Sequence, residues 1–209
     1  MIIKLISIMS EIRNYIPLDI AGKQAFRYML PTSWLNLVKV TLLKSYYDSE
    51  YKIDGLMKTP YTGDHIFLYD IKTNATHQDA LTFTVVDKNR DRWQNKNLAD
   101  LIIFVFREKG ISCFLTRANL VKLLNDKYRI KSKFNPSEYV YLSLEALKEN
   151  ASLILQNGQF SLPNGDSTEV SVKRVWQQDF IIASGKNNNP IKSQSIEKIF
   201  EGLGTISYV

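Results

Sequence analysis

The sequence lacks the features that mark a secreted or membrane-embedded protein. Cys113 is the one cysteine in 209 residues, which excludes an internal disulfide and a zinc site built on several cysteines. Its apolar neighbours indicate a small core residue. No apolar run approaches the ~18 residues of a membrane span, and the opening MIIKLISIM is too short for a secretory signal. We therefore expect a cytoplasmic protein.

The chain also lacks an internal repeat, a long low-complexity tract and a linker. With 44% hydrophobic and 23% charged residues, it has the composition of a globular protein that can bury a core. We therefore predict a single domain over residues 1–209.

The chain has only a small excess of positive charge. Lysine and arginine outnumber aspartate and glutamate by 27 to 21, which gives a net charge of +6. Such an excess is compatible with a polyanionic partner, but it is also common in proteins without one. The net charge alone therefore does not decide whether this protein binds a polyanion.

The spacing of apolar residues predicts helices at both ends of the chain and strands between them. Helix, mixed sheet and further helices together favour an α/β or mixed α+β class. In chain order we expect helices at 2–15, 20–29 and after Pro31; strands at 51–58, 66–73, 81–86, 101–106 and 112–115; helices at 117–127 and 142–149; short strands within 168–183; and a helix at 194–200.

The segment YKIDGLMKTPYTGDHIFLYDIKTN holds two aspartates inside runs that otherwise resemble buried strands. PYTGD is a turn signal and predicts a hairpin in which paired residue numbers sum to 124. Asp54 then lies opposite Asp70, and Lys72 projects from the same face as Asp70. Two opposed carboxylates at ~5 Å repel by roughly 3 kcal/mol at a dielectric of about 20, so something must compensate.

Two arrangements would compensate this repulsion. A divalent cation between the carboxylates would be held by Asp54, Asp70 and a backbone carbonyl such as that of Ile71, with several waters. These hard oxygen ligands favour Mg²⁺ over zinc. Alternatively, Lys72 alone forms a structural salt bridge with one or both acids.

The cation would make this site chemically active. A bound metal ion acidifies water and neutralises the charge that develops on a phosphoryl group during in-line attack. Lys72 would orient or deprotonate the attacking water and stabilise the transition state. Phosphodiester hydrolysis, with Asp54, Asp70 and Lys72 as catalytic residues, is the reaction that follows.

Asp54, a hairpin and then Asp70-Ile71-Lys72 resemble the motif of the PD-(D/E)xK nucleases. The longer run YDIKTNATHQDALTFTVVDKNRDRWQNKNLADLIIFVF is similar to the EcoRV and HincII group of type II restriction endonucleases. This resemblance implies a restriction-endonuclease-like fold, with a central mixed β-sheet flanked by helices, and a Mg²⁺ cofactor. Ile53 precedes the first acid where the family often has proline.

The tail VWQQDFIIASGKNNNP resembles the part of the same group in which a strand leads into a loop that reads bases in the major groove. Asparagine and lysine carry the hydrogen-bonding groups needed for such readout, although an Asn-rich turn is also commonplace. Thr73, Asn74 and Thr76, after the catalytic strand, are candidates for contacts with phosphates or bases. The candidate base readers are Ser184, Gly185, Lys186, Asn187, Asn188 and Asn189.

The resemblance implies a homodimeric, Mg²⁺-dependent type II restriction endonuclease that cuts double-stranded DNA at a short palindromic site, with blunt ends favoured. Residues 1–48 would be the helical, dimerising part, and residues 49–209 would carry catalysis and DNA recognition. A cognate DNA methyltransferase is the expected genetic partner. The alternatives are a repair or recombination nuclease of the same fold and a non-catalytic DNA-binding domain.

Overall fold

The structure is a computed structural model, and it describes residues 20–34, 52–63, 65–74, 78–127, 129–133 and 136–186. The predicted helices at 2–15 and 194–200, and most of the one after Pro31, lie outside these ranges. Residues 20–29 form the predicted helix, and η1 (Thr32–Trp34) follows it. Among the described residues, no helix combines the length and hydrophobicity needed to cross a membrane.

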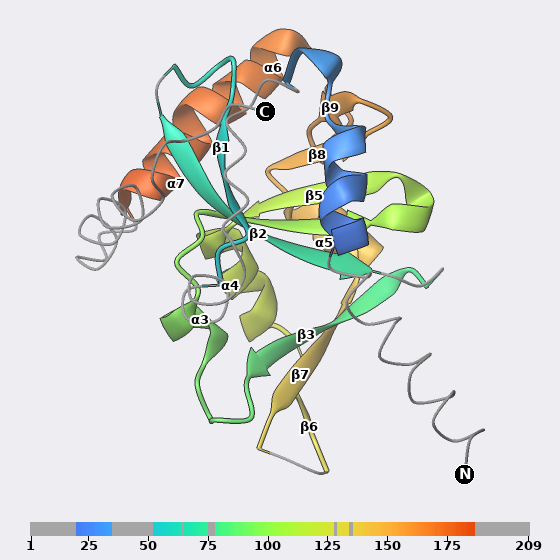
Figure 1. Cartoon of the computed structure of the whole chain (residues 1–209), viewed down its shortest axis with the longest axis vertical. Coiled ribbons are helices and arrows are strands. Elements are labelled where there is room, and N and C mark those ends of the chain that lie inside the picture. Colours follow the sequence, from blue (N-terminus) through green and yellow to red (C-terminus); the bar gives the residue numbers. More distant parts are fainter. Residues whose placement is uncertain are drawn as a thin grey trace.

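A six-stranded mixed sheet forms the centre of the molecule, and its strands run in the order β1-β2-β4-β5-β8-β9 (Figure 1). The β2–β4 pair is parallel and the other neighbours are antiparallel. This confirms a mixed α/β architecture. The strands are β1 (Gly55–Lys58), β2 (Ile66–Asn74), β4 (Leu101–Phe106), β5 (Ile111–Thr116), β8 (Leu153–Gln156) and β9 (Gln159–Ser161).

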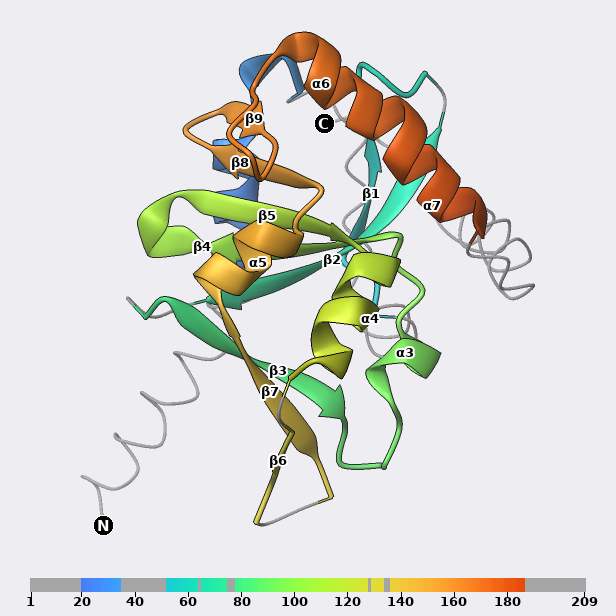
Figure 2. The same ribbon diagram turned by 180° about the vertical axis from the view of Figure 1, so that it is seen from behind.

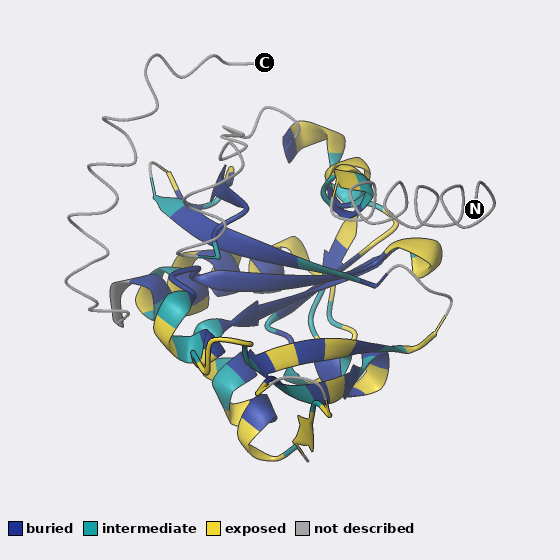
Figure 3. Ribbon diagram, turned by 60° about the horizontal axis from the view of Figure 1, so that its bottom comes forward, coloured by how far each residue is buried: buried dark blue, intermediate teal, exposed yellow. Residues whose placement is uncertain are grey.

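A smaller antiparallel sheet has the strand order β3-β7-β6, formed by β3 (Ala80–Val86), β7 (Glu138–Ser143) and β6 (Ile130–Lys131). Buried and exposed residues alternate along β3, as expected for a strand with one face on the core. In β4, by contrast, every residue is buried. Figure 3 shows this difference between the central strands and the smaller sheet.

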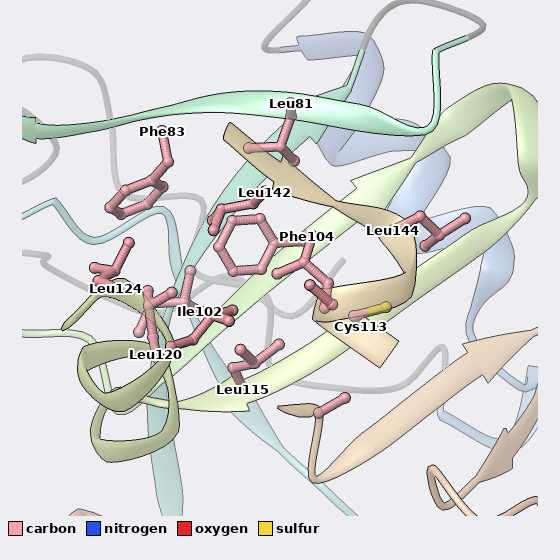
Figure 4. Packing of buried hydrophobic residues seen from close by; sticks show 14 of the residues in the cluster. Leu81, Phe83, Ile102, Phe104, Cys113, Leu115, Leu120, Leu124, Leu142 and Leu144 are labelled. Carbon is pink, nitrogen blue, oxygen red and sulfur yellow. The ribbon is translucent and has the colours of Figure 1, made fainter. Parts of the chain in front are cut away.

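The first core cluster lies between the central sheet and a layer made of the small sheet, α4 (Arg117–Asn125) and α5 (Leu144–Asn150) (Figure 2). Phe104 of β4 lies near Leu142 of β7, and Leu120 of α4 closes the cluster from the side (Figure 4). Both helices begin directly after a strand, at an N-cap hydroxyl that accepts a backbone hydrogen bond. The β5–α4 junction joins this layer directly to the central sheet, whereas α5 continues from β7 within the layer.

The second core cluster covers the other face of the central sheet. Phe26 from the helix at 20–29 contacts Phe114 of β5, with ring centroids 5.7 Å apart, and Trp34 contacts Trp176 at 5.2 Å. A continuous helical segment completes this layer; it consists of α6 (Glu169–Arg174), the π-helical η3 (Val175–Phe180) and α7 (Ile181–Lys186). The described N-terminal residues thus contribute to the chain's own core.

The prediction of short strands within 168–183 is wrong, because this segment is helical. Its β-branched residues favoured a strand, but Val172, Val175, Trp176 and Phe180 are buried at the spacing of one helix face. Thr168 caps the helix by accepting a hydrogen bond from the Ser171 backbone. Packing of this apolar face outweighs the local preference for strand.

The hairpin β8–β9 was not predicted, although its turn carries a sequence signal. Asn157 and Gly158 occupy the turn with φ values of 51° and 75°. Asn-Gly is the preferred pair where both central residues of a two-residue turn need positive φ. The signal was present in the sequence, and the strands that flank it are short.

Candidate metal and catalytic site

The β1–β2 hairpin brings the two predicted acids together. Its register pairs Gly55 with Tyr69, so paired residue numbers sum to 124, as predicted. The Asp54 backbone N–H donates to the Tyr69 carbonyl at 2.8 Å. Asp54 and Gly55 thus both lie against Tyr69, and the register shifts by one residue where β1 begins. Asp54 directly precedes β1, and its side chain interacts with that of Asp70, so the two acids meet although their backbones do not continue the ladder.

Both carboxyl groups are buried and interact directly. Asp54 is 6% exposed and Asp70 is 1% exposed. Burial is the main cause that raises the pKa of Asp70 to about 7, and the Asp54 charge and a hydrogen bond between the two carboxyl groups raise it further, against the opposing effect of Lys72. Burial and the neighbouring acid therefore both favour the neutral form of Asp70.

Lys72 completes the predicted motif. Its ammonium lies 2.6 Å from Asp70 Oδ1, and its side chain is 31% exposed, whereas that of Asp70 is 1% exposed. The lysine therefore reaches from the buried acid towards solvent. This geometry fits both readings of the motif, a catalytic lysine and a structural salt bridge.

Asn97 is a member of the site that the sequence did not reveal. Its Nδ2 donates to Asp70 Oδ2 at 2.6 Å, and its Oδ1 accepts from the Ala99 backbone at 2.9 Å. The Asn97 residue is fully buried and follows the short helix α3 (Trp93–Lys96). Twenty-seven residues separate it from Asp70, and no local pattern marks it.

Lys23 is the second unpredicted member. Its ammonium lies 2.8 Å from Asp54 Oδ1, and it comes from the helix at 20–29. Gly22, next to it, lies so close to the Thr73 side chain that a Cβ at this position would clash. A glycine is therefore required where the helix crosses β2, and this contact places Lys23 at the acid pair.

Backbone and aromatic groups surround Asp54 as well. The Ile71 N–H donates to Asp54 Oδ2 at 2.6 Å, while the Ile71 side chain is buried in the second core cluster. Burial raises the pKa of Tyr69 to about 12; the Asp54 charge adds to this rise and Lys23 opposes it. Tyr69 therefore stays neutral beside the acids at physiological pH.

A cavity of about 370 Å³ lies beside Lys72. Residues from four regions line it: the two ends of the hairpin, strand β3, the loop that leads into α3, and α3 itself. The lysine and arginine side chains of the lining have the charge and hydrogen-bond donors that bind a phosphate group. The aspartates of the lining lie in the loop that leads into α3. The lining residues are Lys52, Lys72, Thr82, Phe83, Thr84, Asp87, Asp91, Arg92, Trp93 and Lys96.

The sequence of the loop DKNRDRWQNKN (residues 87–97) allows two interpretations, a segment that binds phosphates and an ordinary charged loop around a buried tryptophan. Trp93 is 8% exposed, and its ring contacts Phe83 at 5.4 Å and the Arg117 guanidinium at 5.8 Å. Lys96 pairs with Asp91 at 2.6 Å. The buried tryptophan is thus present, and Arg92 and Lys96 also line the cavity.

The predicted phosphate and base contacts after the catalytic strand have different surroundings. Thr73 is half-buried against Gly22. Asn74 is buried, and its amide donates to the carbonyls of Gln78 at 2.7 Å and Ala80 at 3.0 Å. Both amide hydrogens of Asn74 therefore bind the chain itself. Thr76 lies outside the described residues.

The predicted recognition loop is not a loop at its start, because Ser184, Gly185 and Lys186 belong to helix α7. Ser184 is 7% exposed; its hydroxyl donates to the Ile181 carbonyl at 2.8 Å and lies 2.8 Å from His65 Nε2. This serine joins the C-terminal helix to the β1–β2 hairpin, which explains its burial. Asn187, Asn188 and Asn189 lie outside the described residues.

The donor set fits a hard cation. No group of three or more His, Cys, Asp or Glu side chains that could hold a metal ion occurs among the described residues. Asp54 and Asp70 nevertheless offer two adjacent buried carboxyl groups, and their negative charges repel each other when both are ionised. Mg²⁺ is commonly bound by one or two carboxylates and keeps several waters, so a pair suffices.

We compared the chain with protein-family models, with curated proteins and with solved structures. None of the three comparisons gives a match. The case for a function therefore rests on the residues of the motif and on their geometry.

Proposed function

We propose that the protein is a Mg²⁺-dependent nuclease that hydrolyses phosphodiester bonds in double-stranded DNA, with a restriction-endonuclease-like fold. The observation that carries this proposal is the meeting of Asp54 and Asp70 in direct contact, with Lys72 on Asp70. A protein without a use for such a pair would gain stability by replacing it, because burial of two acids is unfavourable.

The acids and the lysine of the site have different roles in the proposed reaction. Asp54 and Asp70 would hold the cation, with the Ile71 carbonyl as a further ligand. The cation, when bound, supplies charge neutralisation and an acidified water. Lys72 lines the adjoining cavity, where it would orient that water towards a bound phosphate.

Asn97 acts on this chemistry through Asp70. Its amide holds Asp70 Oδ2, which leaves the carboxylate one fixed orientation. The cavity admits a phosphate beside Lys72, where Lys52 and Arg92 add positive charge. Together these groups would place the scissile phosphate next to the acid pair.

Within this class we favour a homodimeric type II restriction endonuclease, with a palindromic site, a blunt cut and a cognate methyltransferase. The Asp70-Ile71-Lys72 motif and the sequence around it support this choice. A repair or recombination nuclease on the same core is the alternative. The helical segment at 169–186 favours that alternative, because a strand was expected to lead into the recognition loop and this segment is a helix instead.

Plasmid digestion tests the proposal. Purified protein with Mg²⁺ should convert supercoiled plasmid into linear fragments, and Asp70→Asn and Lys72→Met should not. Discrete, reproducible bands indicate a restriction enzyme, whereas a smear or nicking confined to junctions indicates a repair nuclease. Sequencing the fragment ends would give the site and the cut position.

A non-catalytic DNA-binding protein is the second candidate, and one observation favours it. The acid pair already has two lysine partners, Lys72 at Asp70 and Lys23 at Asp54. Such a pair could be purely structural. Salt-dependent DNA binding without cleavage under any divalent cation would support this candidate and reject the nuclease.

A further inference from the structure

Each of the four carboxylate oxygens of the acid pair lies close to a hydrogen-bond donor. Two of these donors are fixed by the fold. The Ile71 N–H belongs to strand β2 and binds Asp54 Oδ2, and the buried Asn97 amide binds Asp70 Oδ2. The donors on the other two oxygens, Oδ1 of Asp54 and Oδ1 of Asp70, are the ammonium groups of flexible side chains, so these are the oxygens at which a cation can take the place of a donor.

Lysines lie on both of these oxygens. Lys72 is 2.6 Å from Asp70 Oδ1 and belongs to the motif strand itself. Lys23 is 2.8 Å from Asp54 Oδ1 and comes from a helix about thirty residues earlier in the chain. The Lys23 side chain is 21% exposed, so its ammonium can withdraw towards solvent, which the buried carboxylate cannot do.

The backbone that carries Lys23 is held in place. Phe26, one turn further along the same helix, contacts Tyr69 at 6.0 Å and Phe114 at 5.7 Å. Gly22 abuts Thr73 on β2. The ammonium is thus delivered to Asp54 by a fixed helix through a flexible side chain, an arrangement in which the side chain can move alone.

We propose that Lys23 is a built-in counter-ion of Asp54 that competes with a divalent cation for this carboxylate, so that the helix at 20–29 lowers the cation affinity of the acid pair. Mg²⁺ needs an approach of about 2.1 Å to a carboxylate oxygen. An ammonium on that same oxygen competes for its lone pairs and repels the incoming charge. The inference rests on the proposed function, since it concerns the same cation site.

The test is direct measurement of cation binding without DNA. Mn²⁺ serves as the probe, titrated by calorimetry and by the loss of its free electron-spin-resonance signal. Lys23→Met keeps the length of the apolar stem and removes the charge. We expect it to bind Mn²⁺ about tenfold more tightly than the parent, because the competing charge is gone.

Two controls separate this effect from others. Lys23→Arg keeps the charge and should stay near the parent affinity. Lys122→Met removes a positive charge from the exposed face of α4, so it measures the effect of net charge alone and should also leave the affinity near that of the parent. An equal gain in Lys122→Met would overturn the inference.

Thermal unfolding guards against general damage to the fold. Without cation, Lys23→Met should unfold at a lower temperature than the parent, since Asp54 loses its partner; with Mn²⁺ its midpoint should rise by more than that of the parent. A variant with disturbed packing would show a smaller rise. If Lys23→Met does not fold, Lys23→Gln replaces it with the same expectations.

The outcomes distinguish the two proposals. Mn²⁺ binding that is lost in Asp70→Asn but unchanged or weakened in Lys23→Met overturns the counter-ion role and leaves the nuclease in place. Absence of Mn²⁺ binding in the parent and in Lys23→Met, together with absence of cleavage, overturns both. Tighter binding in Lys23→Met without any cleavage supports the counter-ion role and rejects the nuclease.

Discussion

Two aspartate–lysine contacts of equal length occur in this molecule, in opposite environments. Lys72 lies 2.6 Å from Asp70, and Lys96 lies 2.6 Å from Asp91. The side chain of Asp70 is 1% exposed, whereas that of Asp91 is 45% exposed. We call the first the buried pair and the second the surface pair.

Lys96 also lies 3.4 Å from a second acid of the same loop, Asp87, and the pKa values of Asp70 and Asp87 are shifted in opposite directions. Burial, reinforced by Asp54, raises the pKa of Asp70 to about 7 despite the lysine. In the surface loop a slight loss of hydration raises the pKa of Asp87, but backbone N–H groups of Asp91 and Asn89 outweigh it, so the pKa is lowered. At Asp70 burial thus outweighs a lysine at 2.6 Å, whereas at Asp87 the backbone hydrogen bonds outweigh the slight loss of hydration.

The largest expected effect concerns catalysis at the buried pair. Asp70→Asn should lower the rate of Mg²⁺-dependent plasmid cleavage by roughly 10²- to 10⁴-fold, because the cation loses a ligand and Lys72 loses its anchor. Initial rates on supercoiled plasmid measure this. Asp126→Asn, at the exposed end of α4, is the matched control and should cleave at the parent rate.

The next effect is the pH dependence of stability without cation. The folded-state pKa of Asp70 is raised to about 7, so the folded protein binds this proton more tightly than the unfolded chain does. The stability that this proton contributes is present below about pH 4 and is lost as the pH rises to 7.

Asp70→Asn removes this dependence. At pH 8 it should be more stable than the parent by on the order of a few kcal/mol, and the difference should shrink towards pH 4. Urea unfolding across this pH range measures it. If the free energy of unfolding of the parent changed with pH no more than that of the variant between pH 4 and 7, the raised pKa of Asp70 would be contradicted.

A smaller effect is expected at Asn97. Asn97→Ala leaves a buried carboxylate oxygen without its amide donor, which should cost roughly 1 to 3 kcal/mol of unfolding free energy. It should also slow cleavage, because Asp70 is no longer fixed. Asn95→Ala, on the exposed side of α3, is the control for both measurements. Equal effects of the two changes would remove Asn97 from the site.

The smallest effect is expected at the surface pair. Asp91→Asn breaks the contact with Lys96 but leaves both groups in water, so the unfolding midpoint should not change measurably. The same urea titration serves as the measurement. A loss as large as that of Asn97→Ala would mean that the surface pair carries stability, and the contrast between the two contacts would fail.

Much of the central sheet could be predicted from the sequence. The run LIIFVF gave strand β4 with its observed bounds, since a run that is apolar on both faces suits a strand covered on both sides. The segment 168–183 could not be predicted in this way. Its valines favour a strand locally, and the burial of Trp176 and Phe180 on the sheet decides for a helix.

In the candidate site, likewise, some residues could be predicted from the sequence and others could not. The hairpin register and the two-residue spacing of Asp70 and Lys72 follow from the period of a strand and from one turn signal, which are local properties. Lys23 and Asn97 approach the acids from segments distant in sequence, and only the packing of helix and loop against the sheet places them there.

The sequence by itself therefore determined that two carboxylates and a lysine meet at the end of a hairpin, because neighbours along a strand pair have a fixed geometry. Only the tertiary structure decided how deeply these acids are buried and which groups bind them. Burial sets the pKa of Asp70, and burial depends on the layers that cover the sheet. The tertiary structure also decided that the segment 168–183 is a helix, because packing of its apolar face against the sheet contributes more free energy than the local preference for a strand.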